Sequence, residues 1–369
     1  MRIALVHPFT WPNTRRGGER YLHDLAWYLD RAGHEVVIIS AHGGPDAPGV
    51  DTVEGIEVRR GWKRPGPRAR RFPQRLVDVV ETRRIRRALG SGWDVVHALW
   101  PTASVAAAAA GFPTVYTLLG MPTPATREAE PALLRSLGRG AAAADAAGAL
   151  STPVRVIVDE LIPAAWTVLP PGVRVDRFPV APVPAGPPTV LFSASLSTRY
   201  KGLHVVLAAF ARVLDEIPDA ELVLSGAGSP EWAFETLAPD LRERVRAHTR
   251  VAGTGTLDEA DSLYAEASVM VLPSRDEAFG LSVVEALATG CPVVVADHGG
   301  PSEIVGDAPV GSCVPVDDDE AVAQAIVKWI GRADDPSVRS ACRARAMDFD
   351  WEQSVGPLHD RLYEAICVR

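Results

Sequence analysis

The chain has 369 residues, of which 47% are hydrophobic and 23% charged, and its formal net charge is −8. These values are typical of a globular protein of about two domains, and they argue against a general nucleic-acid partner. The four cysteines are too few and too scattered for a disulfide framework or a zinc site. We expect a cytoplasmic protein, because no long apolar run predicts a transmembrane helix and no signal peptide precedes the first strand.

The first half alternates strand-like and helical patterns, as parallel α/β domains do. Residues 2–6 predict the first strand, and the apolar spacing predicts a helix near 18–32 that ends at a cap, Gly33. Further predicted elements are strands at 35–40, 94–98 and 114–118 and an alanine-rich helix near 102–110.

Residues 59–87 differ in composition from the rest, with twelve Arg or Lys residues against two acids, Asp78 and Glu81. A basic amphipathic helix can lie on an anionic membrane. The alternative is a solvated helix face preceded by a loop, and this is the interpretation that we favour from the sequence.

Five prolines within residues 179–188 predict a linker, since such a segment continues neither a helix nor a central strand. The α/β pattern then restarts. Predicted strands lie at 189–193, 221–225, 268–272 and 292–296, a predicted helix at 203–216, and one amphipathic helix at 351–366. Two similar halves joined by a hinge predict a ligand-binding cleft between domains.

The segment 273–303 carries the strongest chemical signal. It follows a predicted strand and opens a helix at about Leu281, and such a unit presents free backbone N–H groups to a phosphate. Gly280 allows close backbone approach. Glu277 and Glu285 flank this position, and two carboxylates beside a phosphate site can hold two polyols, as the ribose and hexose of a nucleotide-sugar require.

With Phe279, Gly280, Ala286, Gly290, Pro292, Gly299, Gly300 and Glu303, the pair Glu277 and Glu285 resembles the E-x7-E donor motif of the retaining glycosyltransferases of family 4. The resemblance covers nearly the whole chain. It implies the GT-B fold, α/β with two Rossmann-like domains that face each other across a cleft. The implied parts are an acceptor-binding domain over 1–180, a nucleotide-sugar-binding domain over 181–350, and a helix over 351–369 that packs back on the N-terminal domain.

The resemblance also implies roles for individual residues. Gly17 and Gly18 correspond to a phosphate-facing loop, and Lys201 to a lysine that neutralises the donor diphosphate. Glu277 would hold hydroxyls of the transferred sugar, and Glu285 the ribose. The remaining donor-site residues are Ser195, Phe279, Gly280, Leu281 and Ser282, the last two through their backbone N–H groups.

Three positions depart from the family pattern. Ser195 stands near a position where relatives usually carry an arginine, and Arg199 is the candidate to replace that missing cation. Leu119 stands where many relatives have a histidine beside the reacting sugar, so the sugar or acceptor pocket is altered. His97 matches a family position but lacks its usual companion, and a structural role for it is as plausible as a role in acceptor binding.

We expect neither a metal nor a cofactor, since the nucleotide-sugar, in its UDP or GDP form, is a substrate. Asp317, Asp318 and Asp319 predict a helix cap and first-turn acids rather than a metal site. The resemblance implies a front-face reaction with retention of configuration, in which Lys201, Arg199 and backbone N–H groups stabilise the departing diphosphate.

The acceptor cannot be read from the motifs. We favour a small molecule, such as an antibiotic, aminocyclitol, sugar or thiol, over a membrane lipid or polysaccharide precursor, since the sequence shows no hydrophobic docking surface. Two alternatives stay open. One is another enzyme of this fold, such as a nucleotide-sugar epimerase or a phosphorylase, and the other is a degenerate binding subunit. We expect a monomer or a homodimer.

Overall fold

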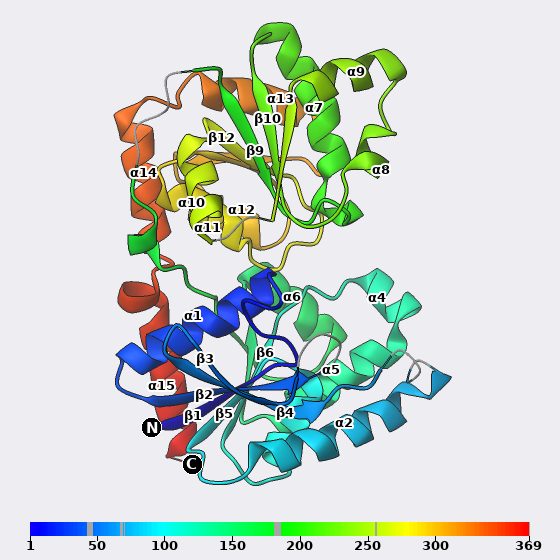
Figure 1. Cartoon of the computed structure of the whole chain (residues 1–369), viewed down its shortest axis with the longest axis vertical. Helices are drawn as coiled ribbons and strands as arrows, with labels where there is room; N and C mark the ends of the chain where they lie inside the picture. The colour runs from blue at the N-terminus through cyan, green and yellow to red at the C-terminus, as the bar shows by residue number, and fades with distance from the viewer. Residues whose placement is uncertain (43–46, 67–68, 70, 181–185, 255–256, 369) are drawn as a thin grey trace. The chain divides into compact units, whose positions relative to one another are not determined.

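The computed structural model describes residues 1–42, 47–66, 69, 71–180, 186–254 and 257–368. It divides into two compact units, with Met1–Gly172 and Trp351–Arg369 in unit 1 and Val173–Asp350 in unit 2 (Figure 1). The first boundary therefore lies earlier than the linker that we predicted over 179–188, of which 181–185 lie outside the described residues. Burial explains the difference, because Val175 and Phe178 are completely buried and so anchor this segment in unit 2.

Unit 1 is built on an eight-stranded sheet in the order β3-β4-β2-β1-β5-β6-β7-β8. Neighbouring strands are parallel except for the β3–β4 pair. The strands are β1 (Arg2–Val6), β2 (Glu35–His42), β3 (Gly49–Val53), β4 (Ile56–Lys63), β5 (Val95–Ala98), β6 (Thr114–Leu118), β7 (Ala146–Ala149) and β8 (Trp166–Val168).

Helices cover both faces of this sheet, with α1 and α15 packed together on one side and α2, α3 and α5 on the other (Figure 1). The helices of unit 1 are α1 (Gly17–Arg31), α2 (Gln74–Leu89), α3 (Pro101–Ala108), α4 (Pro124–Ala129), α5 (Pro131–Ala143), α6 (Thr152–Leu161) and α15 (Gly356–Cys367). The predicted end of the first helix is confirmed, because Gly33 has a left-handed φ of +87° just after it.

Unit 2 has a six-stranded parallel sheet in the order β11-β10-β9-β12-β13-β14. Its strands are β9 (Thr189–Ser193), β10 (Glu221–Ser225), β11 (Thr249–Gly253), β12 (Val269–Leu272), β13 (Val293–Ala296) and β14 (Gly311–Val314). Its helices are α7 (Leu203–Glu216), α8 (Glu231–Phe234), α9 (Pro239–Ala247), α10 (Leu257–Glu266), α11 (Leu281–Ala288), α12 (Gly300–Val305), α13 (Asp319–Ile330) and α14 (Pro336–Met347). Short 3-10 helices cover η2 (Val175–Arg177) and η3 (Arg199–Lys201).

The prediction of a single helix over 351–366 is wrong in detail. Residues Trp351–Val355 form a π-helical turn, η4, before α15 begins at Gly356. Pro357 provides the physical reason, because proline has no N–H to donate and its ring crowds the carbonyl four residues earlier. The wider π turn accommodates both restrictions.

The C-terminal segment packs into unit 1 through aromatic rings. The Trp351 ring is completely buried and stacks on Tyr21 and Tyr28 of α1, at centroid distances of 5.9 and 6.0 Å. Glycines make room for it, since a Cβ at Gly172 would lie 2.6 Å from the Trp351 ring, and one at Gly356 would lie 2.2 Å from Tyr28. The segment is therefore part of the core of unit 1.

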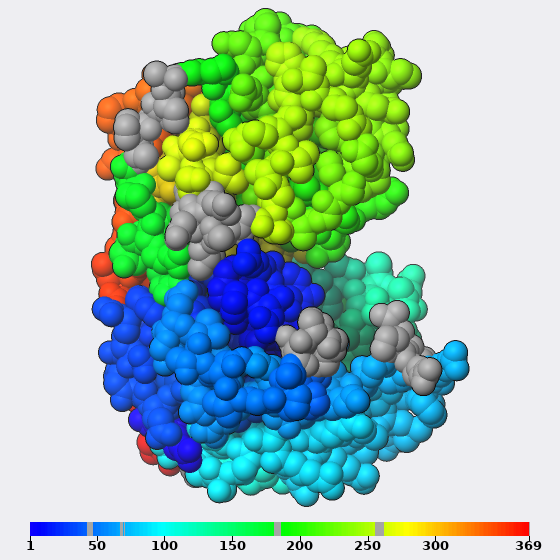
Figure 2. All heavy atoms as spheres, in the orientation of Figure 1, coloured from blue at the N-terminus to red at the C-terminus, as the bar shows by residue number. Residues whose placement is uncertain are grey.

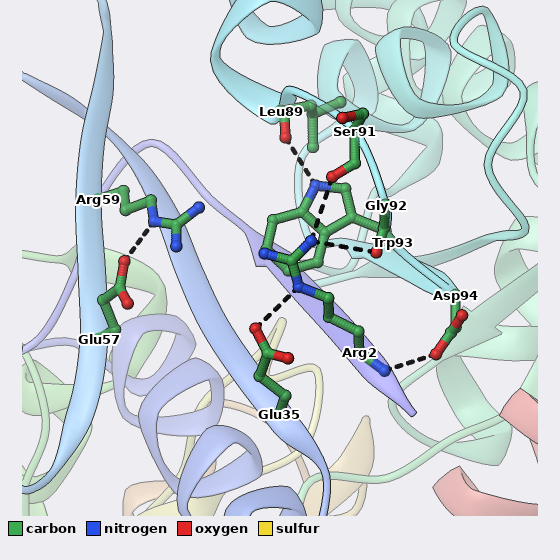
Figure 3. Close-up of polar contacts among 9 residues, drawn as sticks. All are labelled: Arg2, Glu35, Glu57, Arg59, Leu89, Ser91, Gly92, Trp93 and Asp94. Carbon is green, nitrogen blue, oxygen red and sulfur yellow. Dashed lines mark hydrogen bonds and ion pairs between the residues drawn. The ribbon is translucent and has the colours of Figure 1, made fainter.

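A polar cluster at the amino-terminal ends of the strands of the same sheet holds them to the end of α2 (Figure 3). The Arg2 guanidinium lies over the Trp93 ring at 4.5 Å and donates from Nε to Glu35 at 2.8 Å. The Trp93 indole N–H donates to the carbonyl of Leu89 at 2.6 Å, and the Arg2 backbone N–H to Asp94 at 2.7 Å. The C-terminal end of α2 is thereby fixed against β1 and β5.

Replacement of Trp351 by Ala should destabilise the protein by about 3–5 kcal/mol, because it leaves a cavity between two tyrosine rings and two glycines that no side chain fills. Urea unfolding followed by far-UV circular dichroism measures the change. Leu358→Ala, at a 37% exposed position of α15, is the matched control and should cost less than about 1 kcal/mol. Equal effects of the two changes would contradict the packing described here.

Candidate active site

The loop between β12 and α11 is the centre of the candidate site in unit 2. Gly280 precedes the helix with a left-handed φ of +103°, a conformation that L side chains rarely adopt. The N–H groups of Val283 and Val284 donate to the Gly280 carbonyl. Within the described part of the chain, those of Leu281 and Ser282 have no backbone acceptor, so this helix end can bind an anion.

Glu277 is held in place by backbone contacts. The Gly300 N–H donates to the Glu277 carbonyl at 2.9 Å. A Cβ at Gly299 would lie 2.5 Å from that carbonyl oxygen, and one at Gly300 would lie 2.4 Å from the Cα of Phe279. The loop therefore packs directly on the segment that opens α12, and the two glycines of the sequence motif are explained by this close approach.

Lys201 pairs with Glu277, and both side chains are largely buried, at 17% exposure. Lys201 ends the 3-10 turn after β9, and the loop that carries Glu277 lies against this turn. A Cβ at Gly202 would lie 2.5 Å from the Pro273 carbonyl, and the Arg275 N–H donates to the Tyr200 carbonyl at 2.9 Å. The two predicted residues thus come together, cation beside carboxylate.

Glu285 lies on α11 beyond this helix end and accepts a hydrogen bond from the Tyr264 hydroxyl at 2.9 Å. The same hydroxyl lies 2.9 Å from the Ser193 hydroxyl, at the end of β9. Tyr264 is only 3% exposed. Tyr264 matches the family pattern in the sequence, but its contact with Glu285 was not predicted.

Three other predicted donor-site residues make contacts of a different kind. The Phe279 ring is 4% exposed and packs edge-on against Phe349 at 5.5 Å, and its place in the donor site stays a prediction. The Ser195 hydroxyl lies 2.7 Å from that of Thr198. The Arg199 guanidinium lies over the Trp232 ring at 4.9 Å, and its role as a second cation stays a prediction.

The three acids after β14, Asp317 to Asp319, make different contacts from one another. The predicted cap is confirmed, because the Ala321 N–H donates to Asp318 at 2.9 Å and Asp319 begins α13. Asp317 differs from the prediction: it has a φ of +60° and pairs with Arg275 in the loop before Glu277. Among the described residues, no cluster of acids, histidines and cysteines could hold a metal ion.

Unit 1 contains the predicted acceptor-side residues. Gly17 and Gly18 open α1, and a Cβ at Gly18 would lie 3.0 Å from Leu119, so the structure brings Gly18 and Leu119 together. His97 is completely buried, with Nδ1 2.6 Å from the Tyr363 hydroxyl and Nε2 2.7 Å from that of Thr117. Burial lowers the pKa of His97 well below its usual value. Both ring nitrogens have partners, which favours the structural alternative, and the role of His97 in acceptor binding stays a prediction.

Sequence reasoning missed a cationic cluster between the loop that joins β1 to α1 and the residue that follows β4. The guanidinium groups of Arg16 and Arg64 both lie over the Phe9 ring, at 4.7 and 4.0 Å. Arg16 also pairs with Glu19 at 2.6 Å. His7 lies beside Phe9, and burial lowers its pKa. The cluster brings residues 16 and 64 together from different elements, and spacing alone could not reveal this.

Two family models together match most of this chain. The model of the family described as Glycosyl transferases group 1 matches residues 175–346, and that of Glycosyltransferase Family 4 matches 15–177. A glycogen synthase of Mycobacterium tuberculosis is 31% identical over 392 residues, which cover 95% of this chain and 92% of the relative. The chain belongs to glycosyltransferase family 4. Another similar member is the phosphatidyl-myo-inositol mannosyltransferase of Mycolicibacterium smegmatis, 29% identical over 388 residues, with 99% of this chain and 94% of the relative covered.

Solved structures of glycosyltransferases share the fold. The sucrose-phosphate synthase of Thermosynechococcus elongatus aligns with a TM-score of 0.81 at 22% identity, over 99% of both chains. Anabaena HepE, solved in complex with UDP and glucose, aligns with a TM-score of 0.74 at 19% identity, over 99% of both chains. The predicted GT-B class, with two parallel-sheet Rossmann-like units, is therefore confirmed.

Tyr264→Phe should weaken nucleoside diphosphate binding by about three- to tenfold, because Glu285 loses the donor that orients its carboxylate. Isothermal titration with UDP and GDP measures the change. Tyr200→Phe is the control, since its ring stays beside Lys201 and its hydroxyl is not bonded to Glu285. Unchanged affinity in Tyr264→Phe would show that Tyr264 does not position Glu285.

Proposed function

We propose that this family 4 glycosyltransferase moves a sugar from a nucleoside diphosphate donor to its acceptor with retention of configuration and without a metal ion. The observation that carries the proposal is the Lys201–Glu277 pair beside the open helix end at Leu281. A cation and free N–H groups suit the diphosphate of a nucleotide-sugar, and the nearby carboxylate suits hydroxyls of its sugar. The UDP in the HepE complex supports the same donor class.

Each group has a distinct task in this proposal. Lys201 and the N–H groups of Leu281 and Ser282 stabilise the negative charge that develops on the departing diphosphate. Glu277 exchanges its bond to Lys201 for hydroxyls of the transferred sugar, and Glu285, oriented by Tyr264, binds the ribose. Holding donor and acceptor in line then supplies much of the rate enhancement.

Retention follows in this proposal from a front-face reaction. The acceptor hydroxyl approaches the anomeric carbon on the face from which the diphosphate departs, and the transition state resembles an oxocarbenium ion. The departing phosphate oxygen accepts the acceptor proton, so no protein base is needed. The bond to the diphosphate breaks as the bond to the acceptor oxygen forms.

Glu277→Ala should lower kcat by roughly two to four orders of magnitude, because its bonds to the sugar are strongest in the transition state. Glu285→Ala should mainly raise the KM for the donor. Single-turnover and steady-state kinetics with the nucleotide-sugar that best stabilises the protein in a thermal-shift panel measure both effects.

Glu266→Ala is the control for these variants, because Glu266 is an exposed residue of unit 2 paired with Arg250 at 3.9 Å. Normal kinetics in both site variants would overturn the donor assignment. Turnover of the donor to an epimer without acceptor would favour an epimerase, and an absence of both transfer and donor hydrolysis would favour a degenerate binding subunit. Proton NMR of the product tests retention.

For the acceptor, we propose a polyol that carries a phosphate. Arg16 and Arg64 beside Phe9 form a cationic, partly apolar surface at the start of α1, and guanidinium groups suit phosphate oxygens. Two similar family members are named for such compounds: the phosphatidyl-myo-inositol mannosyltransferase, and a D-inositol 3-phosphate glycosyltransferase of Corynebacterium kroppenstedtii, 32% identical over 48% of this chain. The phosphate is common to a small metabolite and to a lipid headgroup.

Arg64→Met should raise the KM for a phosphorylated acceptor by about 10- to 100-fold, because one charge-assisted contact is lost, and should leave the KM of the unphosphorylated polyol unchanged. Transfer assays with inositol phosphate, inositol and phosphatidylinositol measure the effect and separate the two phosphate sources. Arg31→Met, at an exposed ion pair with Glu352, is the control. Equal KM changes for phosphorylated and plain polyols would contradict the assignment.

A further inference from the structure

The outward face of α2 has no part in the reaction proposed above. In most surface helices the apolar side chains face the core, whereas in α2 carboxylates face the core and apolar side chains face outward. The buried face of this surface helix carries two carboxylates in its first half. Asp78 accepts from the Ser136 hydroxyl at 2.8 Å and pairs with Arg139, both on α5. Glu81 accepts from the Thr102 hydroxyl at 2.9 Å and from the indole N–H of Trp100 at 3.1 Å. Polar groups thus hold the helix to the rest of unit 1.

The opposite face exposes apolar side chains. Phe72 is 63% exposed, Leu76 56%, Val79 40% and Val80 43%. Their spacing of three and four residues places them in one stripe along α2 and the turn that precedes it. The stripe continues in the second half of the helix with the exposed arginines Arg83, Arg86 and Arg87. We call the residues from Phe72 to Arg87 on this side the α2 face.

The α2 face cannot turn inward to bury its apolar residues. Rotation of α2 would break the bonds of Asp78 and Glu81 and would bury the arginines of the same face without partners, which costs more than exposing the four apolar side chains. The Trp93 indole also holds the Leu89 carbonyl at the end of the helix (Figure 3). Figure 2 shows the segment that contains α2 on the outer surface of unit 1. The apolar stripe is therefore presented to the surroundings permanently.

We propose that the α2 face docks on an anionic phospholipid surface, with Phe72, Leu76, Val79 and Val80 at the acyl boundary and Arg83, Arg86 and Arg87 among the lipid phosphates. An interfacial helix needs an apolar stripe and cations on the same side, and the α2 face has both. The charge is not cancelled locally, because the acids described over residues 71–90, Asp78 and Glu81, are both turned inward.

A second copy of this chain fits the α2 face less well. Antiparallel pairing of two such stripes would bury the arginines of one copy against the valines of the other, and parallel pairing would set arginine against arginine. The chain as a whole carries a net charge of −8, so attraction to an anionic membrane depends on this local cationic surface. No described helix is long and apolar enough to cross a membrane.

Docking on lipid reverses the preference that we drew from the sequence, where no hydrophobic surface was evident over residues 59–87. The residues were visible there, but their exposure was not, because a surface helix normally turns its valines and leucines inward. Binding of the α2 face to vesicles needs neither donor nor acceptor and is independent of the proposed reaction.

Flotation of the full chain with vesicles tests the proposal. The vesicles contain phosphatidylcholine alone or with phosphatidylglycerol. We expect wild-type protein to float with the anionic vesicles, less so in high salt, and not with the neutral ones. The double variant Arg83→Glu/Arg87→Glu should bind at least about tenfold less, and Leu76→Ser/Val79→Ser about three- to tenfold less at low salt.

Two variants serve as matched controls in unit 1. Val156→Ser changes an apolar residue of α6 that is 51% exposed, and Arg361→Glu reverses an exposed charge on α15. Both should bind as wild type does, and thermal unfolding should be unchanged in all variants. Wild-type protein that floats with neither vesicle would overturn the proposal, as would control variants that lose as much binding as the α2 variants. Light scattering that shows a dimer lost in Leu76→Ser/Val79→Ser would assign the face to a protein partner instead.

Discussion

The close approach of three loops in unit 2 is the constraint on which the candidate site depends. The turn after β9, the loop after β12 and the start of α12 lie so near each other that Gly202, Gly299 and Gly300 have no space for a side chain. Because backbone packs on backbone there, the main-chain positions of Glu277 and Lys201 are fixed by close contacts and backbone hydrogen bonds. A site held in this way keeps its geometry while substrates enter and leave.

The sequence predicted the elements of this site well for a physical reason. Buried parallel strands are short apolar runs, and β9, β10 and α7 of unit 2 have the predicted bounds, as does β6 of unit 1. The motif around Glu277 and Glu285 can be recognised in a single sequence because its glycines and carboxylates lie within one short segment. The features that were missed are all contacts between distant segments. Tyr264 reaches Glu285, Arg275 reaches Asp317, and Arg64 reaches Phe9, and none of these has a signature in spacing.

Burial separated residues that looked equivalent in the sequence. His97 and Phe279 both match family positions, yet both lie inside the protein. His97 joins β5 and β6 to α15 through Tyr363 and Thr117, and Phe279 packs on Phe349. On α2, burial also differs from what residue type suggests, because valines that resemble core residues are exposed and two carboxylates are buried. Residue type sets a tendency, and the network of partners decides each case.

The stacking of Trp351 on Tyr21 and Tyr28 has a consequence for how this protein is made and recombined. Unit 1 consists of the two ends of the chain, whereas unit 2 is continuous. During synthesis, unit 2 is therefore complete before the ribosome has released the last part of unit 1, whose core must wait for Trp351. A chimera that exchanges the acceptor-side unit between relatives must take the C-terminal segment with it. Otherwise α1 from one relative would pack against the C-terminal segment of another, and any mismatch between them would lie in the core of unit 1.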